Sequence, residues 1–167
     1  NSLIKEIGAH EIKNFSDYYR STLQELFSFS EVKREDISSI QNAIQYANKM
    51  RFVIETHART HYQIENVTAN VRELNHIENV YGIVTDKERT AFSQSLDVIN
   101  SLSHGISFTD EFVNTKSPKG IQDAIRCIIC VLFRKDPEHI LCMYGDDGPD
   151  RAAFKKKILQ WSSHILG

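Results

Sequence analysis

The fold of this chain is decided by the stretch Ile121–Phe133, which reads IQDAIRCIICVLF. Apolar residues occupy nearly all sides of a helix drawn through this stretch, as expected for a helix buried at the centre of a fold. Apolar residues at helical spacing recur on both sides of it, and no strand-like alternation lasts more than a few residues. The sequence therefore predicts an all-α fold, a compact bundle of about six to seven helices.

Apolar spacing, capping residues and turn residues set the bounds of the expected helices. Asp36 is suited to cap the second helix, Thr85 and Glu88 resemble a capping box, and Pro137 can begin a short helix capped by Asp136. The expected helices are Leu3–Phe29, Asp36–His61, Ile64–Tyr81 ending near Gly82, a helix from Thr85 to His104, Ile121–Phe133, a short helix from Pro137, and Arg151–Ile165. The expected links are Ser30–Glu35, the loop Ile106–Gly120, which is placed to act as a lid, and the turn Gly145–Asp150.

Length and composition bound the class of protein. The 167 residues suit one domain, and 41% hydrophobic and 25% charged residues are ordinary for a soluble globular protein. No apolar run approaches the roughly 20 residues that span a bilayer, and the first residues, NSLIKEIGAHE, have neither the basic start nor the apolar core expected of a signal sequence. Three cysteines without such a signal favour the cytoplasm. Because the chain starts at Asn1 and not at a methionine, we expect a fragment of a longer protein or a processed chain.

The formal net charge of −2 argues against a broad basic surface for nucleic acid. An RNA contact would therefore be local. The best candidate for it is a cluster near the C-terminus, formed by Arg151, Lys155, Lys156 and Lys157. The alternative is that these side chains are simply solvated on the last helix.

Two pairs of polar residues are candidates for a catalytic site. Arg51 and Glu55 are four residues apart on one expected helix, and Asn100 and His104 have the same spacing on another. A guanidinium, a carboxylate, an amide and an imidazole are the groups that metal-free RNA cleavage needs. The alternative is an ordinary surface ion pair and a histidine at a helix end.

No metal or cofactor is expected. Cys127, Cys130, His139 and Cys142 have a spacing similar to that of zinc ligands, but the first two fall in the most apolar helix and are expected to be buried packing residues. His57 and His61 could hold a metal, but the carboxylate of the H-E-x-x-H motif is missing. GDDGPD at 145–150 lacks the length of an EF-hand loop, and no P-loop, G-x-G-x-x-G or G-x-S-x-G motif is present.

The segments ANKMRFVIE (47–55), VINSLSHG (98–105) and KDPEHILCM (135–143) follow one another in an order that resembles a known family. They are similar to the C-terminal region of the PrrC and RloC anticodon nucleases and related ABC-type ATPases of bacterial defence systems. FSDYYRSTLQELF (15–27) resembles a stretch that precedes the R-x3-E motif in that group. The similarity spans about Phe15 to Met143.

The resemblance implies a helical domain related to HEPN ribonucleases, with Arg51, Glu55 and His104 as its nuclease triad and Asn100 one turn before the histidine. It further implies that the chain cleaves RNA, such as tRNA, in phage defence, that it works as a homodimer, and that an ABC-type ATPase acts with it in cis or in trans. The ATPase part of such proteins is absent from this sequence, which fits a fragment or a stand-alone effector. The chain also departs from many HEPN nucleases at Ile99, where they have an arginine just before the asparagine. That difference leaves open a non-catalytic domain that dimerises or docks on the ATPase.

Overall fold

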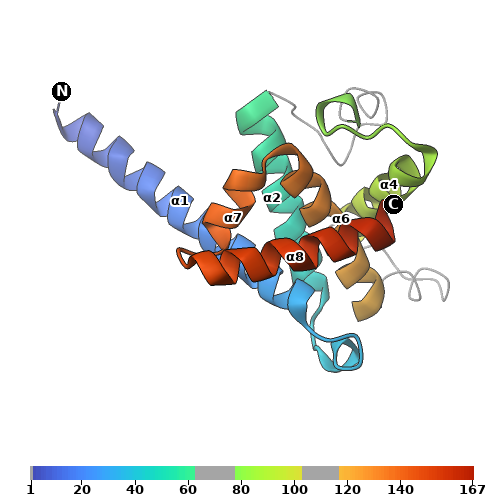
Figure 1. Ribbon diagram of the computed structural model, residues 1–167. Coiled ribbons are helices and arrows are strands. Elements are labelled where there is room, and N and C mark those ends of the chain that lie inside the picture. Colours follow the sequence, from blue (N-terminus) through green and yellow to red (C-terminus); the bar gives the residue numbers. More distant parts are fainter. Residues whose placement is uncertain (1, 63–77, 103–116) are drawn as a thin grey trace.

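The computed structural model describes residues 2–62, 78–102 and 117–167 of the chain. Among these residues it contains helices and no strand, so the predicted all-α class is confirmed (Figure 1). The helices are α1 (Ser2–Glu31), the 3-10 helix η1 (Ile37–Ser39), α2 (Ile44–Tyr62), α4 (Asp86–Leu102), α6 (Pro118–Lys135), α7 (Pro137–Tyr144) and α8 (Gly148–Ile165). No described helix is both long enough and apolar enough to cross a membrane.

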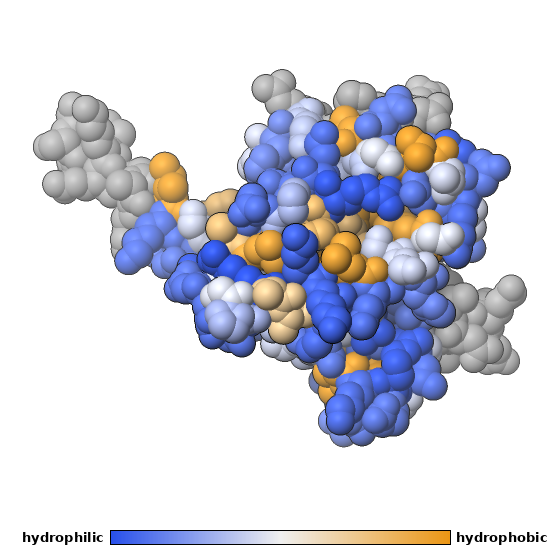
Figure 2. Space-filling view, viewed as in Figure 1, coloured by the Kyte–Doolittle hydropathy of each residue, from blue (hydrophilic) through white to orange (hydrophobic). Residues whose placement is uncertain are grey.

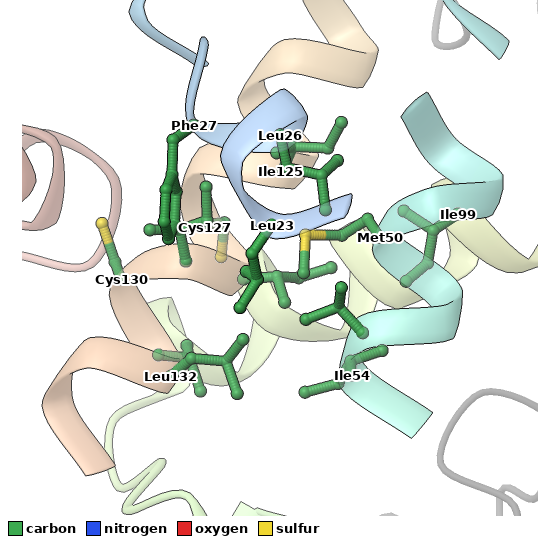
Figure 3. Close-up of a cluster of buried hydrophobic side chains, with 14 of the residues drawn as sticks. Leu23, Leu26, Phe27, Met50, Ile54, Ile99, Ile125, Cys127, Cys130 and Leu132 are labelled. Atoms are coloured by element: carbon green, nitrogen blue, oxygen red, sulfur yellow. The ribbon is translucent and has the colours of Figure 1, made fainter. Parts of the chain in front are cut away.

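Helix α6 is the centre of the bundle, as its sequence predicts. Helices α1, α2, α4, α7 and α8 all pack against it, and α8 crosses in front of it in Figure 1. Figure 3 shows side chains from four helices meeting in the core, with Met50 of α2 between Leu23 of α1 and Ile99 of α4. All three are fully buried. The core therefore fixes the position of α2, which carries Arg51 and Glu55, and that of α4, which carries Asn100.

Of the side chains of helix α1 that the structure describes, only those from Tyr19 onward contribute buried residues to the core. The N-terminal part of α1 extends away from the rest of the molecule (Figure 1). Ile12 is 68% exposed, and Phe15 and Tyr18 are 48% and 58% exposed although their rings contact Phe52 of α2. The face of the molecule seen in Figure 2 is otherwise mostly hydrophilic, with scattered apolar groups. At its other end α1 runs through Glu31, so the predicted link Ser30–Glu35 begins two residues too early.

The predicted start of the second helix at Asp36 is wrong. Asp36 precedes the 3-10 helix η1 and its side chain makes no capping hydrogen bond, and α2 begins only at Ile44. The interruption is at Asn42, whose φ of 56° is left-handed and cannot continue an α-helix. Asparagine tolerates this conformation better than most residues.

The predicted helix end at Gly82 and the predicted capping box of Thr85 and Glu88 are both confirmed. Residues 64–77 of the predicted helix Ile64–Tyr81 lie outside the described part of the chain. Gly82, with φ 70°, ends a helical turn in which its N–H donates to Asn79 O at 3.3 Å and Ile83 N–H donates to Glu78 O at 2.8 Å. This is the Schellman pattern. Glu88 N–H donates to Thr85 Oγ1 at 3.1 Å while the Glu88 carboxylate accepts from Thr85 N–H at 3.3 Å, which completes the predicted capping box.

The later boundaries differ from prediction by a few residues. The predicted loop Ile106–Gly120 ends too late, because Ser117 caps α6 through Gly120 N–H at 3.2 Å and Pro118 is its first residue. The rest of that loop lies outside the described residues. Pro137 begins α7 as predicted. The predicted turn at 145–150 is shorter, since α8 starts at Gly148.

Candidate functional site

The predicted Arg51–Glu55 pair lies on α2 at the edge of its buried face. Arg51 Nε donates to Glu55 Oε1 at 3.0 Å, and each side chain is 25% exposed. Met50 and Ile54, which precede them, are fully buried against the core. The two charged groups are thus anchored to a rigid helix while their heads remain within reach of solvent.

Of the second predicted pair, Asn100 lies on α4, which packs against α2. Asn100 is partly exposed and follows Ile99, which is fully buried and lies beside Met50 in Figure 3. His104 lies outside the described residues. The structure therefore brings Arg51 and Glu55 together and places the helix of Asn100 against theirs.

The predicted RNA-binding cluster lies on α8, where its members have different surroundings. Lys155 and Lys156 are exposed, Lys157 contacts the Glu31 carboxylate, and Arg151 contacts the carbonyl of Gly145. Successive helical residues point about 100° apart, so the three lysines spread around the helix. Lys155 and Lys156 are the members best exposed for a local phosphate contact.

A second polar group, absent from the sequence prediction as a unit, lies at the C-terminal end of α2. It consists of His57, His61, Asp136 and His139, and is called here the imidazole cluster. The rings of His57 and His61 stack with centroids 4.4 Å apart, and the His139 ring lies 5.7 Å from His57 and 6.0 Å from His61. Asp136 Oδ2 is 3.5 Å from His57 Nε2 and 4.0 Å from His61 Nε2. Three imidazoles and a carboxylate therefore share one location.

His57 is the buried member of this cluster, with no exposed surface. Its Nδ1 lies 2.9 Å from the Tyr81 hydroxyl, whereas its Nε2 has no hydrogen-bond partner although Asp136 is near. Burial and, to a smaller extent, His61 lower the pKa of His57 to about 4, against the opposite effect of Asp136. At neutral pH His57 is consequently an uncharged imidazole.

His61 and His139 face a small pocket beside the cluster. The pocket has a volume of about 180 Å³ and is lined also by Tyr19, Thr60 and Met143. The hydroxyl of Tyr19 is 3.0 Å from His139 Nε2, and burial lowers the pKa of His139. The imidazole cluster is therefore open to small ligands on the side of His61.

Asp136 is the residue whose role the sequence did not reveal. It occupies the predicted N-cap position of α7, but its side chain makes no capping hydrogen bond and faces the two histidines of α2 instead. A helix N-cap aspartate is a local signal, whereas a contact with α2 depends on the tertiary fold. No spacing in the sequence could have shown that contact.

The cysteines do not join this cluster. Cys127 and Cys130 are buried in α6, as expected, and Cys142 is exposed on α7. In Figure 3 Cys127 lies within the cluster of apolar side chains, whereas Cys130 lies at its edge. Burial raises the pKa of the Cys127 thiol to about 11 and that of Cys130 to about 12. Cys130 Sγ lies 3.6 Å from the carbonyl of Ile158. Among the described residues, the group close enough to share one ion is His57, His61 and Asp136.

Comparison of the chain with protein-family models, with curated proteins and with solved structures finds no match. The resemblance to anticodon nucleases thus depends on the short motifs quoted from the sequence. The function has to be argued from the side chains themselves.

Proposed function

We propose that this chain is a metal-independent RNA endonuclease, acting on tRNA or a similar RNA. The observation that supports the proposal is the Arg51–Glu55 ion pair at 3.0 Å, partly exposed on the helix that packs against the helix of Asn100. Both helices are fixed by core residues, which is the rigid support that a catalytic site needs.

The proposed reaction is attack of a ribose 2′-hydroxyl on the adjacent phosphorus. Glu55 accepts the hydroxyl proton, the 2′-oxygen bonds to phosphorus, and the bond from phosphorus to the 5′-oxygen breaks. His104 protonates the departing 5′-oxygen, and the planar Arg51 guanidinium stabilises the charge on the phosphorane oxygens. The products are a 2′,3′-cyclic phosphate and a 5′-hydroxyl, and no oxidant or metal is consumed.

Asn100 and the basic residues of α8 have positioning roles in this proposal. Asn100 orients the imidazole or the phosphate, and Lys155 and Lys156, with Arg151 and Lys157, contact the RNA backbone outside the cut. A homodimer would join two shallow sites into one groove, and an ABC-type ATPase would control access to it. Phage defence in the cytoplasm is the setting that the sequence resemblance supports.

The decisive experiment is incubation of purified protein with total tRNA in EDTA, followed by mapping of the new RNA ends. We expect cyclic phosphate and 5′-hydroxyl ends, and loss of cutting in Arg51→Ala, Glu55→Gln and His104→Ala. Arg20→Ala is a matched control, because Arg20 is also a helix-surface arginine with one acidic neighbour, Asp146. An exposed ion pair adds about 0.3–0.5 kcal/mol, so far-UV circular dichroism should show all variants folded.

Three results would count against this function. Cutting that needs an added divalent metal would contradict the mechanism, and full activity in all three variants would contradict the site. A folded protein that cuts no RNA under any condition would favour the non-catalytic interaction domain instead.

A further inference from the structure

The imidazole cluster contains three donor atoms that converge on one point from two separate elements. His57 and His61 are one turn apart near the end of α2, and Asp136 immediately precedes α7. One donor atom from each lies within 4.8 Å of the other two. Metal–nitrogen bonds of about 2.05 Å at the tetrahedral angle separate ligand atoms by roughly 3.4 Å. The separations of 3.5 and 4.0 Å from Asp136 Oδ2 to the two Nε2 atoms are therefore within a small side-chain rotation of that geometry.

The Nδ1 atom of each imidazole, on the far side of the ring from the proposed metal, has a hydrogen-bond partner of its own. His61 Nδ1 lies 3.1 Å from the backbone carbonyl of His57, and a carbonyl only accepts, so the proton of a neutral His61 is on Nδ1. Its Nε2 then presents a lone pair toward Asp136. His57 Nδ1 lies 2.9 Å from the Tyr81 hydroxyl, whose oxygen can accept a hydrogen bond from an Nδ1–H in the same way. Backbone and side-chain partners of this kind orient metal-binding histidines.

Two polar groups at this point are left without the partners expected for them. His57 Nε2 is completely buried and has no hydrogen bond, and buried nitrogen atoms in proteins are almost always paired. Asp136 occupies an N-cap position without capping the helix. Its carboxylate Oδ2 lies 3.5 Å from this nitrogen, which is longer than a well-formed hydrogen bond. A cation between the three donors would give both groups a partner.

We propose that His57 Nε2, His61 Nε2 and Asp136 Oδ2 bind one divalent transition-metal ion of the Zn²⁺ type. Two imidazoles and one carboxylate form a nitrogen-rich set that suits zinc, whereas magnesium and calcium prefer oxygen ligands alone. Three protein ligands leave a coordination position for water. His61 also lines the 180 Å³ pocket, which gives that position access to small anions.

The bound ion would fasten the end of α2 to the start of α7. The inference does not depend on the proposed nuclease activity, because Arg51 and Glu55 contact each other on a different side of α2 and take no part in the metal site. The ion has a positioning role in the fold, and RNA cleavage is expected to continue when a chelator removes it.

The test is titration of the chelator-treated full chain with Zn²⁺ alone by calorimetry, and with Co²⁺ alone by visible absorption. We expect one Zn²⁺ per chain, a Co²⁺ spectrum typical of nitrogen and oxygen ligands, and a higher melting temperature with Zn²⁺. His61→Ala and Asp136→Asn should each weaken binding more than tenfold, because loss of a direct ligand exceeds the effect of a supporting partner. Both positions have substantial solvent exposure, 44% and 32% for the side chains, so the variants should fold.

Two matched controls separate this site from other metal-binding groups. His164→Ala removes an exposed histidine on α8, and Cys142→Ser removes the exposed thiol; neither should change the affinity. The proposal is overturned if the protein binds no Zn²⁺, if His61→Ala and Asp136→Asn bind it as the parent does, or if Cys142→Ser abolishes binding. Failure of RNA cleavage with normal Zn²⁺ binding would count against the nuclease alone.

Discussion

Replacing Gln122 with leucine tests how α1 is held against α6. Gln122 is fully buried in α6, and its amide nitrogen donates to Val32 O at 2.8 Å and to Phe29 O at 3.0 Å. The last carbonyl groups of an α-helix have no partner within the helix, and Phe29 is in the last turn of α1. The side-chain oxygen of Gln122 also accepts a hydrogen bond from Arg34 Nη1 at 2.9 Å. Leucine keeps most of the volume and removes all of these bonds.

The magnitude follows from what each carbonyl retains. A typical hydrogen bond contributes about 0.5–1.5 kcal/mol net, and a buried acceptor left alone costs about 1–3 kcal/mol. Here the Phe29 carbonyl still accepts from Val32 N–H at 3.3 Å, and the Val32 carbonyl still accepts from Arg126 Nη2 at 3.4 Å. Arg34 likewise keeps its ion pair with Asp123. These three hydrogen bonds are therefore lost, but none of the groups that Gln122 contacts is left without a partner. We expect the free energy of unfolding to fall by about 2 kcal/mol.

Urea unfolding followed by far-UV circular dichroism measures this change, and the melting temperature should fall by about 4–8 °C for a chain of this size. Gln24→Leu is the matched control, because the amide of Gln24 also donates to a carbonyl, that of Met143 at 3.3 Å, but at an exposed position. That variant should lose less than about 0.5 kcal/mol. Equal losses in the two variants, or none in Gln122→Leu, would refute the assignment of Gln122 as the residue that caps α1 from outside.

Two further predictions concern titratable groups. In the folded protein a thiol reagent such as Ellman's reagent should label Cys142 alone. Cys127 and Cys130 should react only after unfolding, because burial raises the pKa of both thiols. Rapid labelling of these two thiols in the native protein would contradict their buried position. Burial disfavours the charge of Glu88, but backbone N–H groups of Val84 and Thr85 together with Arg134 outweigh it and lower its pKa. The contribution of the Glu88 charge to the stability of the fold is therefore present at neutral pH, and it is lost as the pH falls below the usual range of a glutamate. We expect Glu88→Gln to lower the free energy of unfolding by about 2 kcal/mol at pH 7 and by much less at pH 3. Unfolding curves at the two pH values measure this, with Glu35→Gln at an exposed position as control; a constant difference would show that the charge of Glu88 is not responsible.

The sequence predicted the parts of the fold that depend on neighbours along the chain. The capping box of Thr85 and Glu88, the helix end at Gly82 and the apolar α6 are each encoded within a few residues. The error at Asp36 has the same origin, because an aspartate before an apolar run looks like an N-cap and the left-handed Asn42 does not stand out in the sequence. What caps the end of α1 could not be predicted, since Gln122 and Arg126 reach it from a helix far away in the sequence.

The two polar groups on α2 illustrate the same limit at the candidate site. Arg51 and Glu55 on one side, and His57 and His61 on the other, are each four residues apart; the spacing assigns Glu55 to Arg51 and leaves the histidines without a carboxylate. At about 100° per residue the centres of the two pairs are about 120° apart around the helix axis, so no single pocket can hold both. Glu55 contacts Arg51, and the carboxylate beside the histidines comes from Asp136. Helix α2 thus separates two polar sites, and a substitution in one pair should leave the chemistry of the other intact.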